Sequence, residues 1–330
     1  MRAVPLAGVL LFTLVSVLLF RFFDDGSGNE REFRLRSPVL GTFATYIVLA
    51  GETSGDSILL AMDSLARALD RELGFFGNGE LSRLNSTGGA ALNEISDDLL
   101  RVLKKSVFMA EITDTLFDPS LGNLMVLWDF GAEGIRKIPD SSQVAGALAL
   151  SGFSGVNFSG DSIRLSDGVK LDLGAIAKGY VSDRVYALAM TMGASAALVE
   201  IGGEIRCGGD ASTGRTWSIG VKDPRKDGLL DVFEIEGGAV ATSGDYESFF
   251  VRDGVRYCHI LDPRTGYPER GVLSVTVISD SASTADALAT AIAVGGVPTA
   301  EALPDSLFRL IVVVYEAYDG SMVQWRRKGV

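Results

Sequence analysis

The stretch LDLGAIAKGYVSDRVYALAMTMG, residues 171–193, predicts a strand that turns sharply into a helix. The strand is expected to end at Asp172, Gly174 lets the backbone turn, and Lys178 falls at the start of the helix. Free N–H groups and a cation at a helix N-terminus form a natural cradle for phosphate. The spacing matches neither a Walker A loop nor GxGxxG, so a helix that merely carries a solvated lysine stays an open alternative.

On the N-terminal side of this stretch, apolar residues recur at helical spacing. The pattern predicts a long helix, then a second helix with Ser96 as its N-cap, and a weaker third helix over residues 139–152. An opening strand is expected over residues 31–50. The two apolar stripes are Ile58, Met62, Leu65, Leu69 and Leu73, and then Leu99, Leu103 and Val107.

On the C-terminal side, short strands joined by turns dominate, and Asp253-Gly254 is a strong hairpin signal. Strands are expected within residues 156–165, 169–174, 197–209, 217–223, 233–244, 249–262 and 273–279, with a closing hairpin over residues 307–325. Helices followed by strands favour an α+β fold over a doubly wound parallel sheet. We therefore expect a single large domain with mixed, largely antiparallel sheets flanked by helices.

Residues 1–23 are expected to form a signal peptide or a membrane anchor, because eighteen uncharged residues, 3–20, follow a short basic start. No small-x-small cleavage site follows them, which favours an uncleaved anchor. Residues 24–32 then form a polar linker and residues 33–330 the folded domain, outside the cytoplasm. In such a compartment Cys207 and Cys258 could pair, although inert burial is an equal alternative.

The charge balance argues against a nucleic-acid partner. The 330 residues include 30 Lys and Arg against 42 Asp and Glu, a formal net charge of −12. A nucleic-acid-binding surface needs clustered Lys and Arg. A polyanionic ligand of this chain must therefore meet local positive charge or a metal ion.

Asp286 and Thr290 lie one turn apart in the helix predicted over residues 283–296, so a carboxylate and a hydroxyl share one face. Mg²⁺ prefers hard oxygen ligands of this kind, together with backbone carbonyl groups, phosphate and water. A cation site at this position is one interpretation. The other is that Asp286 only complements the dipole of its helix.

The only histidine of the chain, His259, lies just before a turn rich in Pro and Gly. A side chain that titrates near neutrality is the usual proton carrier of an active site. With Ser243 and Asp262 it also permits a serine hydrolase, although the GxSxG elbow of many such enzymes is absent.

Taken together and in order, these stretches resemble the ApbE family of flavin transferases. The similarity covers about nine-tenths of the chain and includes LGTFATY (40–46), ELSRLN (80–85), LFDPSLGNLMVLWDFG (116–131), LDLGAIAKGYVSD (171–183), EIGGEIRCGG (200–209), TSGDYES (242–248), HILDPRTGYP (259–268) and ADALATAIAVGG (285–296). The resemblance implies an ApbE or T-fold-like domain.

The family moves FMN from FAD onto a Thr or Ser hydroxyl of an extracytoplasmic protein, through a phosphoester bond and with Mg²⁺, and releases AMP. The resemblance thus implies a Mg²⁺-dependent FAD:protein FMN transferase with FAD as its substrate. A Mg²⁺-dependent FAD pyrophosphatase that yields FMN and AMP, and a non-catalytic flavin-binding protein, are the alternatives.

The resemblance also assigns roles to individual residues. It implies that Asp286 and Thr290, with backbone oxygen from Ala175 and Ala289, hold the metal, and that His259 is the base that takes the proton of the acceptor. The residues implied to line the flavin nucleotide are Leu40, Phe75, Leu116, Phe117, Asp118, Asp172, Lys178 and Ile260. Leu40 stands where the family often has Met, and Phe75 where Tyr is common. Leucine conserves the volume, and phenylalanine keeps ring stacking but loses a hydroxyl hydrogen bond.

Overall fold

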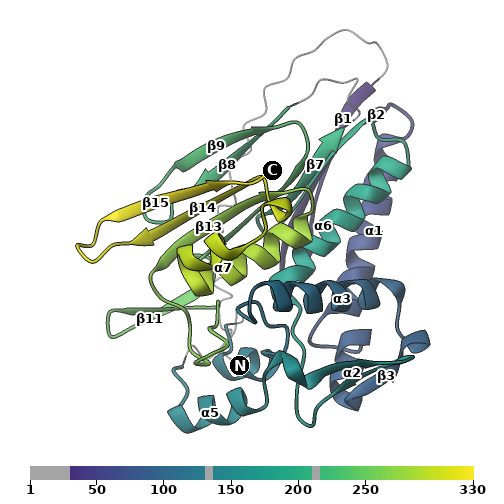
Figure 1. Cartoon of the computed structure of the whole chain (residues 1–330). Helices are drawn as coiled ribbons and strands as arrows, with labels where there is room; N and C mark the ends of the chain where they lie inside the picture. The colour runs from purple at the N-terminus through teal and green to yellow at the C-terminus, as the bar shows by residue number, and fades with distance from the viewer. Residues whose placement is uncertain (1–29, 131–136, 210–215) are drawn as a thin grey trace, which may run out of the picture.

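An eight-stranded sheet runs through the middle of the molecule (Figure 1). The computed structural model describes residues 30–130, 137–209 and 216–330. The strand order is β1-β2-β6-β7-β10-β13-β14-β15, and every neighbouring pair is antiparallel. The strands are β1 (Glu30–Val39), β2 (Thr42–Gly51), β6 (Ala196–Ile201), β7 (Glu204–Gly209), β10 (Gly238–Gly244), β13 (Val272–Ser279), β14 (Leu310–Glu316) and β15 (Met322–Lys328).

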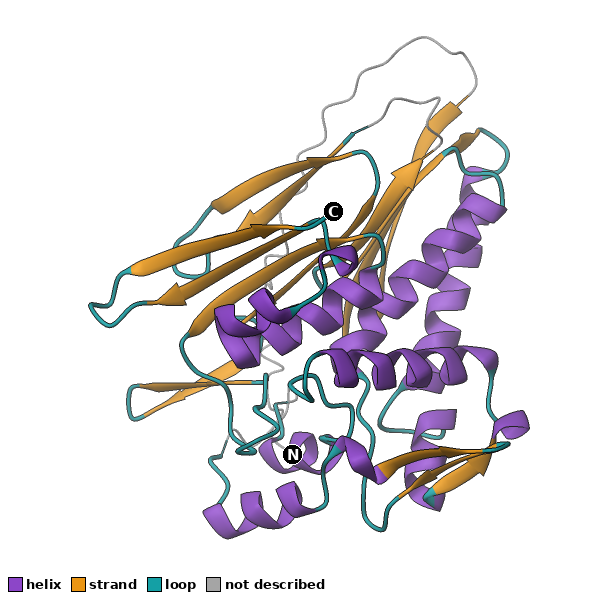
Figure 2. Ribbon diagram, viewed as in Figure 1, coloured by secondary structure: helices purple, strands orange, loops and turns teal. Residues whose placement is uncertain are grey.

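Three long helices cover one face of this sheet, and a fourth helix packs against them (Figure 2). The three are α1 (Gly55–Leu73), α6 (Gly174–Thr191) and α7 (Ala282–Ala302), and the fourth is α3 (Asp97–Ile112). The main hydrophobic core lies between the helices and the sheet, where Val199 of β6 packs in the same cluster as Val181 of α6 and Leu288 of α7. Burial of these apolar side chains is the main term that stabilises the layered arrangement.

A two-stranded ribbon, β8 (Trp217–Lys222) and β9 (Leu229–Ile235), covers part of the other face. Leu198, next to Val199 in β6, packs there with Trp217 and Ile219. Successive side chains of a strand point to opposite faces, so one strand supplies both cores. The sheet is therefore buried on both sides in its central strands.

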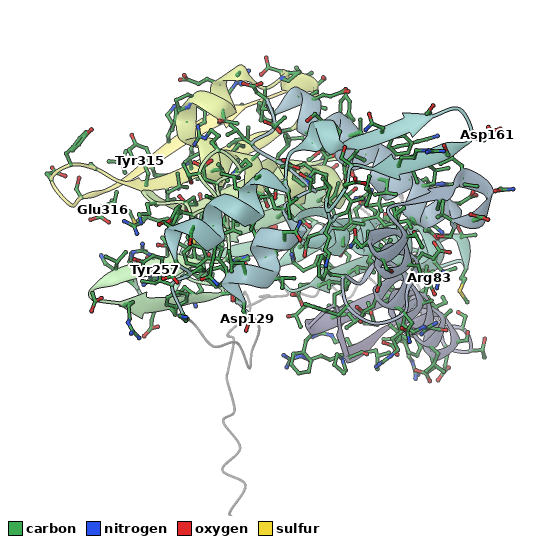
Figure 3. All side chains as sticks on the ribbon, turned by 90° about the horizontal axis from the view of Figure 1, so that it is seen from below. Arg83, Asp129, Asp161, Tyr257, Tyr315 and Glu316 are labelled. Atoms are coloured by element: carbon green, nitrogen blue, oxygen red, sulfur yellow. The ribbon has the colours of Figure 1, made fainter. Side chains whose placement is uncertain are left out.

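Smaller elements complete the molecule at one end of the sheet (Figure 1). They are the helices α2 (Glu80–Thr87), α4 (Gly122–Trp128) and α5 (Ser141–Ala149), a three-stranded sheet of β3 (Gly89–Ala91), β5 (Ser162–Leu165) and β4 (Val156–Ser159), and the hairpin β11 (Phe249–Arg252) and β12 (Val255–Cys258). Short 3₁₀ turns cover Leu92–Glu94, Phe153–Gly155 and Asp305–Leu307. In Figure 3, Arg83 and Asp161 of this end lie on the opposite side of the molecule from Tyr257 of β12.

The structure confirms the α+β class and most of the elements predicted from periodicity. The first stripe lies in α1, where Ile58 is buried and Leu65 packs partly exposed against the core. Ser96 caps α3, because its hydroxyl accepts a hydrogen bond from the amide of Leu99 at 3.2 Å. The closing hairpin is β14 and β15, and the turn at Asp253-Gly254 joins β11 to β12.

Two predictions about strands were wrong in detail. Residues 169–174 form no strand, and a single isolated bridge pairs Lys170 with Leu121. The opening segment is a hairpin instead of one strand, because the chain reverses at Leu40 and Gly41, whose φ angles are 51° and 69°. β1 begins at Glu30, so residues 30–32, which we assigned to the linker, belong to the sheet.

The expected signal or anchor, residues 1–23, lies outside the described residues, as does most of the expected linker. In the three described ranges, no helix combines the length and the apolar character needed to cross a bilayer. Cys207 and Cys258 are both free and buried. Of the two alternatives for the cysteines, the structure therefore shows burial without pairing.

Candidate active site

Helices α6 and α7 touch each other at Gly179. A Cβ atom at this position would lie 2.4 Å from the carbonyl oxygen of Ala282, closer than side-chain atoms approach backbone. The absent side chain lets the Gly179 amide donate a hydrogen bond to Asp286 Oδ2 at 3.0 Å. The two motifs that carry these residues, 107 positions apart, are thus joined at one point.

The other residues predicted to hold a metal lie within one turn of this contact along the same two helices. In an α-helix the amide of residue i faces the carbonyl oxygen of residue i−4, so the Ala175 carbonyl lies beside the amide that binds Asp286. Thr290 follows Asp286 by one turn of α7, and its Oγ1 lies 3.5 Å from the hydroxyl oxygen of Ser243 in β10. Ala289, also buried, has no side-chain oxygen, so only its backbone oxygen could serve.

The donor set fits a hard divalent cation. A carboxylate, a hydroxyl and backbone carbonyl groups are oxygen ligands of the type that Mg²⁺ takes, with the remaining positions left to phosphate and water. Asp286 is 2% exposed, so a cation there would meet little competing water. Among the described residues, no group of three or more His, Cys, Asp or Glu side chains forms a metal site. A cation at Asp286 would therefore depend on backbone oxygen and on a ligand phosphate.

Lys178 lies among three carboxylates. Its Nζ is 3.2 Å from Glu204 Oε1 and donates a hydrogen bond to the Gly174 carbonyl oxygen at 3.3 Å. Burial alone would lower the pKa of Lys178, but the charges of Asp286, Glu204 and Glu247 outweigh it and raise that pKa. The lysine is therefore charged at neutral pH, and about a quarter of its side chain, 24%, still meets solvent.

Burial opposes the negative charge of the carboxylates around Lys178. Burial raises the pKa of Glu204, and the charge of Lys178 opposes this shift. Burial, again opposed by Lys178, also raises the pKa of Asp286. The Glu204 Oε2 atom is buried without a hydrogen-bond partner in the described part of the chain. Such an atom is costly unless a ligand or ion later satisfies it.

His259 follows β12 directly, and its backbone amide donates a hydrogen bond to the Ser248 carbonyl oxygen at 2.9 Å. Burial, together with the positive charge of Lys178, lowers the pKa of His259 to about 4. The imidazole is thus neutral near pH 7 and able to accept a proton. The Nδ1 atom of His259 is buried and has no hydrogen-bond partner among the described residues.

The phosphate cradle predicted at the start of α6 is largely wrong. The Gly174 amide already donates to Asp172 Oδ1 at 2.7 Å, and the amides of Ile176 and Ala177 donate to the Leu173 carbonyl oxygen. Few N–H groups of that helix end remain for a ligand. Asp172 instead acts as a turn residue, with its own amide bound to the Pro119 carbonyl oxygen at 2.7 Å.

The other residues expected to line the nucleotide differ in how much surface they offer. Leu116, Phe75 and Leu40 are partly exposed, whereas Phe117 and Ile260 are 1% and 5% exposed and pack in the main core. Asp118 accepts hydrogen bonds from the Ser120 amide and hydroxyl, and burial raises its pKa despite them. Phe117 and Ile260 thus belong to the hydrophobic core and offer little side-chain surface to a ligand.

The turn that contains Leu40 lies near Lys178, because both Thr42 and Lys178 lie close to Gly202. A Cβ atom at Gly202, in the turn between β6 and β7, would lie 2.8 Å from the Thr42 side chain and 3.4 Å from Lys178 Cδ. The Leu40 amide donates to Asp70 Oδ2 at 2.9 Å, which fixes the positive φ of the turn. The segments around residues 40, 178 and 202 are therefore close in space.

An aromatic cluster holds the loop that carries His259. Trp128 of α4 stacks on Tyr257 with ring centroids 5.9 Å apart, and its Nε1 donates to the Gly266 carbonyl oxygen at 2.8 Å. Tyr257 also stacks on Phe250 at 5.1 Å. Figure 3 shows Asp129, the residue after Trp128, on the same side of the molecule as Tyr257. The motif at residues 116–130 thus supports the histidine loop.

The arrangement does not support a serine hydrolase. Asp262 is bound by Arg264 through two hydrogen bonds of 2.9 and 2.8 Å, and these lower its pKa against the effect of its burial. No partner contacts His259 Nδ1 in the part of the chain that the structure describes. The Ser243, His259 and Asp262 set is therefore not assembled as a triad.

Sequence reasoning missed Glu204 and Glu247 as neighbours of Lys178. No local signal singled out Glu204, because its strand EIRC, residues 204–207, also carries Arg206. Glu247 lies in a motif that we had quoted without a role for this residue. Its position near Lys178 follows only from the folded arrangement.

Comparison with known proteins gives a consistent picture. The model of the ApbE family matches residues 40–312. A FAD:protein FMN transferase of Vibrio cholerae is 31% identical over 321 residues, 94% of each chain, and one of Treponema pallidum is 31% identical over 288 residues, 81% of this chain and 79% of that one. The crystal structure of the ApbE protein from Thermotoga maritima superposes with a TM-score of 0.81 at 35% identity, over 89% of this chain and 97% of that one. The flavin transferase ApbE from Vibrio cholerae gives a TM-score of 0.78 at 29% identity, over 90% and 97%. The relatives from Vibrio cholerae and Treponema pallidum are named as transferases, and this chain belongs to the ApbE family.

Proposed function

We propose that this chain is a Mg²⁺-dependent FAD:protein FMN transferase, which attaches FMN through a phosphoester bond to a Thr or Ser of an acceptor protein and releases AMP. One observation carries the proposal: the amide of Gly179, next to Lys178, donates a hydrogen bond to Asp286, and the charge of Lys178 acts on the pKa of both Asp286 and His259. The relatives named above act on FAD and on a protein, which supports the choice of both substrates.

The metal would be held by oxygen atoms from α6 and α7. Asp286, Thr290 and the backbone oxygen atoms of Ala175 and Ala289 would hold it. A bound Mg²⁺ would supply neutralisation of the diphosphate charge. The chemical fit of these oxygen donors, and the low exposure of Asp286, support the assignment.

The chain's own residues would divide the remaining work. Lys178 stays positively charged and would orient the dinucleotide phosphates within the carboxylate-rich site. His259 is neutral and would accept the proton of the incoming hydroxyl. The acceptor oxygen then bonds to the FMN phosphorus, the bond from that phosphorus to the bridging oxygen breaks, and AMP leaves with that oxygen.

We also propose that the enzyme works outside the cytoplasm, held at the membrane by residues 1–23. This proposal depends on the apolar character of residues 3–20 in the sequence. Fractionation of cells that express the full chain, followed by alkaline extraction of the membranes, tests it. Recovery of the chain in the soluble cytoplasmic fraction would contradict it.

The transfer reaction is tested with the detergent-solubilised full chain, FAD, Mg²⁺ and a Thr-bearing acceptor flavoprotein. We expect in-gel flavin fluorescence on the acceptor, equimolar AMP, and loss of both with EDTA. The same acceptor with Thr→Val at the modified position is the matched control. Release of FMN and AMP without labelling would instead identify a pyrophosphatase, and tight FAD retention without turnover a flavin-binding protein.

A further inference from the structure

Asp183 of α6 holds the first turn of α7 through several hydrogen bonds. Its Oδ1 accepts from the Ala282 amide at 2.8 Å, and its Oδ2 accepts from the Ser283 amide at 3.0 Å. The hydroxyls of Ser281 and Ser283 both donate to Oδ2 at 2.8 Å. A carboxylate at a helix N-terminus satisfies amides that have no partner within the helix and complements the helix dipole.

A lysine from a third helix completes this arrangement. Lys105 of α3 donates hydrogen bonds to the hydroxyl oxygens of Ser281 and Ser283, both at 2.7 Å. The two serines therefore pass hydrogen bonds from the ammonium group to the carboxylate of Asp183. Burial lowers the pKa of Lys105, and the charge of Asp183 opposes this shift. Arg206 of β7 lies 3.5 Å from Asp183 Oδ1 on the remaining side.

The position of Asp183 on α6 relates this cluster to the metal site. Residues 175, 179 and 183 are spaced by four, so they lie along one face of the helix. Along this face are the carbonyl of Ala175, the amide of Gly179 bound to Asp286, and the carboxylate of Asp183. Asp183 holds residues 281–283, one turn before Asp286 on α7. A slip of α7 along α6 would move the Asp286 carboxylate away from Gly179 and Ala175.

We propose that Asp183, with Lys105 and the two serines, is a positioning cluster that fixes the register of α7 against α6 and so presents Asp286 to the divalent cation. The inference rests on the proposed function, because it takes Asp286 as the metal ligand. Asp183 touches neither the cation nor the substrates and acts through the backbone of α7. Partners behind a metal ligand affect metal affinity about 10- to 100-fold in other proteins.

The test measures cation binding directly. Mn²⁺ binding to the full chain is followed by electron paramagnetic resonance, with FMN and AMP present to supply phosphate. We expect Asp183→Asn to raise the Mn²⁺ dissociation constant about 10- to 100-fold. The Mg²⁺ concentration for half-maximal activity should rise by a similar factor, while kcat at saturating Mg²⁺ recovers most of its value. Lys105→Met is a second variant that keeps the carboxylate and should show a smaller effect in the same direction.

Asp98→Asn is the matched control. Asp98 of α3 also ties a carboxylate to α6, through the Tyr180 hydroxyl and Arg184, both at 2.7 Å, but it has no contact with α7 among the interactions described. We expect it to lower the melting temperature and to change Mn²⁺ affinity less than 2-fold.

The possible outcomes distinguish failure of the positioning role of Asp183 from failure of the proposed metal-dependent function. Unchanged Mn²⁺ affinity in Asp183→Asn, or equal weakening in Asp98→Asn, would overturn the positioning role and leave the proposed function intact. Absence of Mn²⁺ binding to the unmodified chain would overturn the metal site itself, and the role of Asp183 with it. Weakening confined to Asp183→Asn and Lys105→Met supports the inference.

Discussion

The backbone amide of Gly179 donates a hydrogen bond to the carboxylate of Asp286 at 3.0 Å, across the point where α6 and α7 touch. The contact is close because Gly179 has no side chain: an added Cβ would lie 2.4 Å from the Ala282 carbonyl oxygen and 2.7 Å from Ser283 Cα. Stability and the proposed cation site thus depend on the same pair of residues.

Gly179→Ala should lower both the stability of the fold and the affinity of the proposed site for a divalent cation. The methyl group meets backbone, which cannot rotate away, so we expect a loss of about 1–3 kcal/mol in unfolding free energy and weaker Mn²⁺ binding. Urea unfolding measures the change in unfolding free energy. Gly146→Ala in α5 is the control, since a Cβ there meets nothing within 4 Å, and it should leave stability unchanged or raise it by up to about 1 kcal/mol. Equal behaviour of the two variants would refute the close contact.

Asp286→Asn should remove most of the activity with little loss of fold. The side-chain carbonyl oxygen of the variant can still accept the hydrogen bond from the Gly179 amide, but it has no negative charge to attract a cation. We expect kcat to fall by about two to three powers of ten, measured as AMP release from FAD. Asp280→Asn is the control, because Asp280 is 81% exposed and pairs only with Arg309 in the described structure. A variant at position 286 with normal Mg²⁺-dependent turnover would exclude this carboxylate as a ligand.

The acid limb of the pH profile should report His259. Burial and the charge of Lys178 lower its pKa from 6.5 to about 4, so the imidazole stays unprotonated over most of the acid range. The kcat/KM for transfer should therefore remain high at pH 6 and fall only as the pH approaches about 4. In Lys178→Met the fall should begin at higher pH, because a positive charge that disfavours the imidazolium is gone. A limb centred near 6.5 in the unmodified enzyme would contradict the lowered pKa.

Lys178→Met should destabilise the chain in a pH-dependent manner. Without the lysine, the pKa values of Glu204 and Asp286 rise further, since burial already raises both and Lys178 opposes it. These carboxylates then lose unfavourable charge as the pH falls. We expect the unfolding free energy to be lower by about 3 kcal/mol at pH 8, with a deficit that shrinks toward pH 5, measured by urea unfolding. Lys104→Met on the exposed side of α3 should show no such trend.

The sequence allowed the long helices and hairpins to be predicted because their patterns are local. The stripe from Ile58 to Leu73 and the cap at Ser96 need only neighbours a few positions away. Residues 169–173 show where this reasoning fails: Val169, Leu171 and Leu173 are buried in alternation, as in a strand. The backbone of Leu171, however, is held by the side chain of Asn85, with bonds of 2.7 and 2.8 Å, instead of by a neighbouring strand.

The candidate site was predictable only in part for a related reason. Motifs indicated Asp286, Lys178 and His259, because their residue types suit the chemistry. Periodicity gave no sign that Glu204 approaches Lys178 or that Asp183 holds the start of α7, because both contacts cross between elements far apart in the chain. Such neighbours are fixed by tertiary packing, which a single sequence does not display.

The hydrogen bond between Gly179 and Asp286 spans 107 residues, and β6, β7, β10 and β13 of the central sheet all fall between its ends. Closing a contact over so many residues costs chain entropy that a local contact does not. A cation held at Asp286 would bind only to chains in which these two helices have already met, so the free energy of ion binding would add directly to the stability of the folded state.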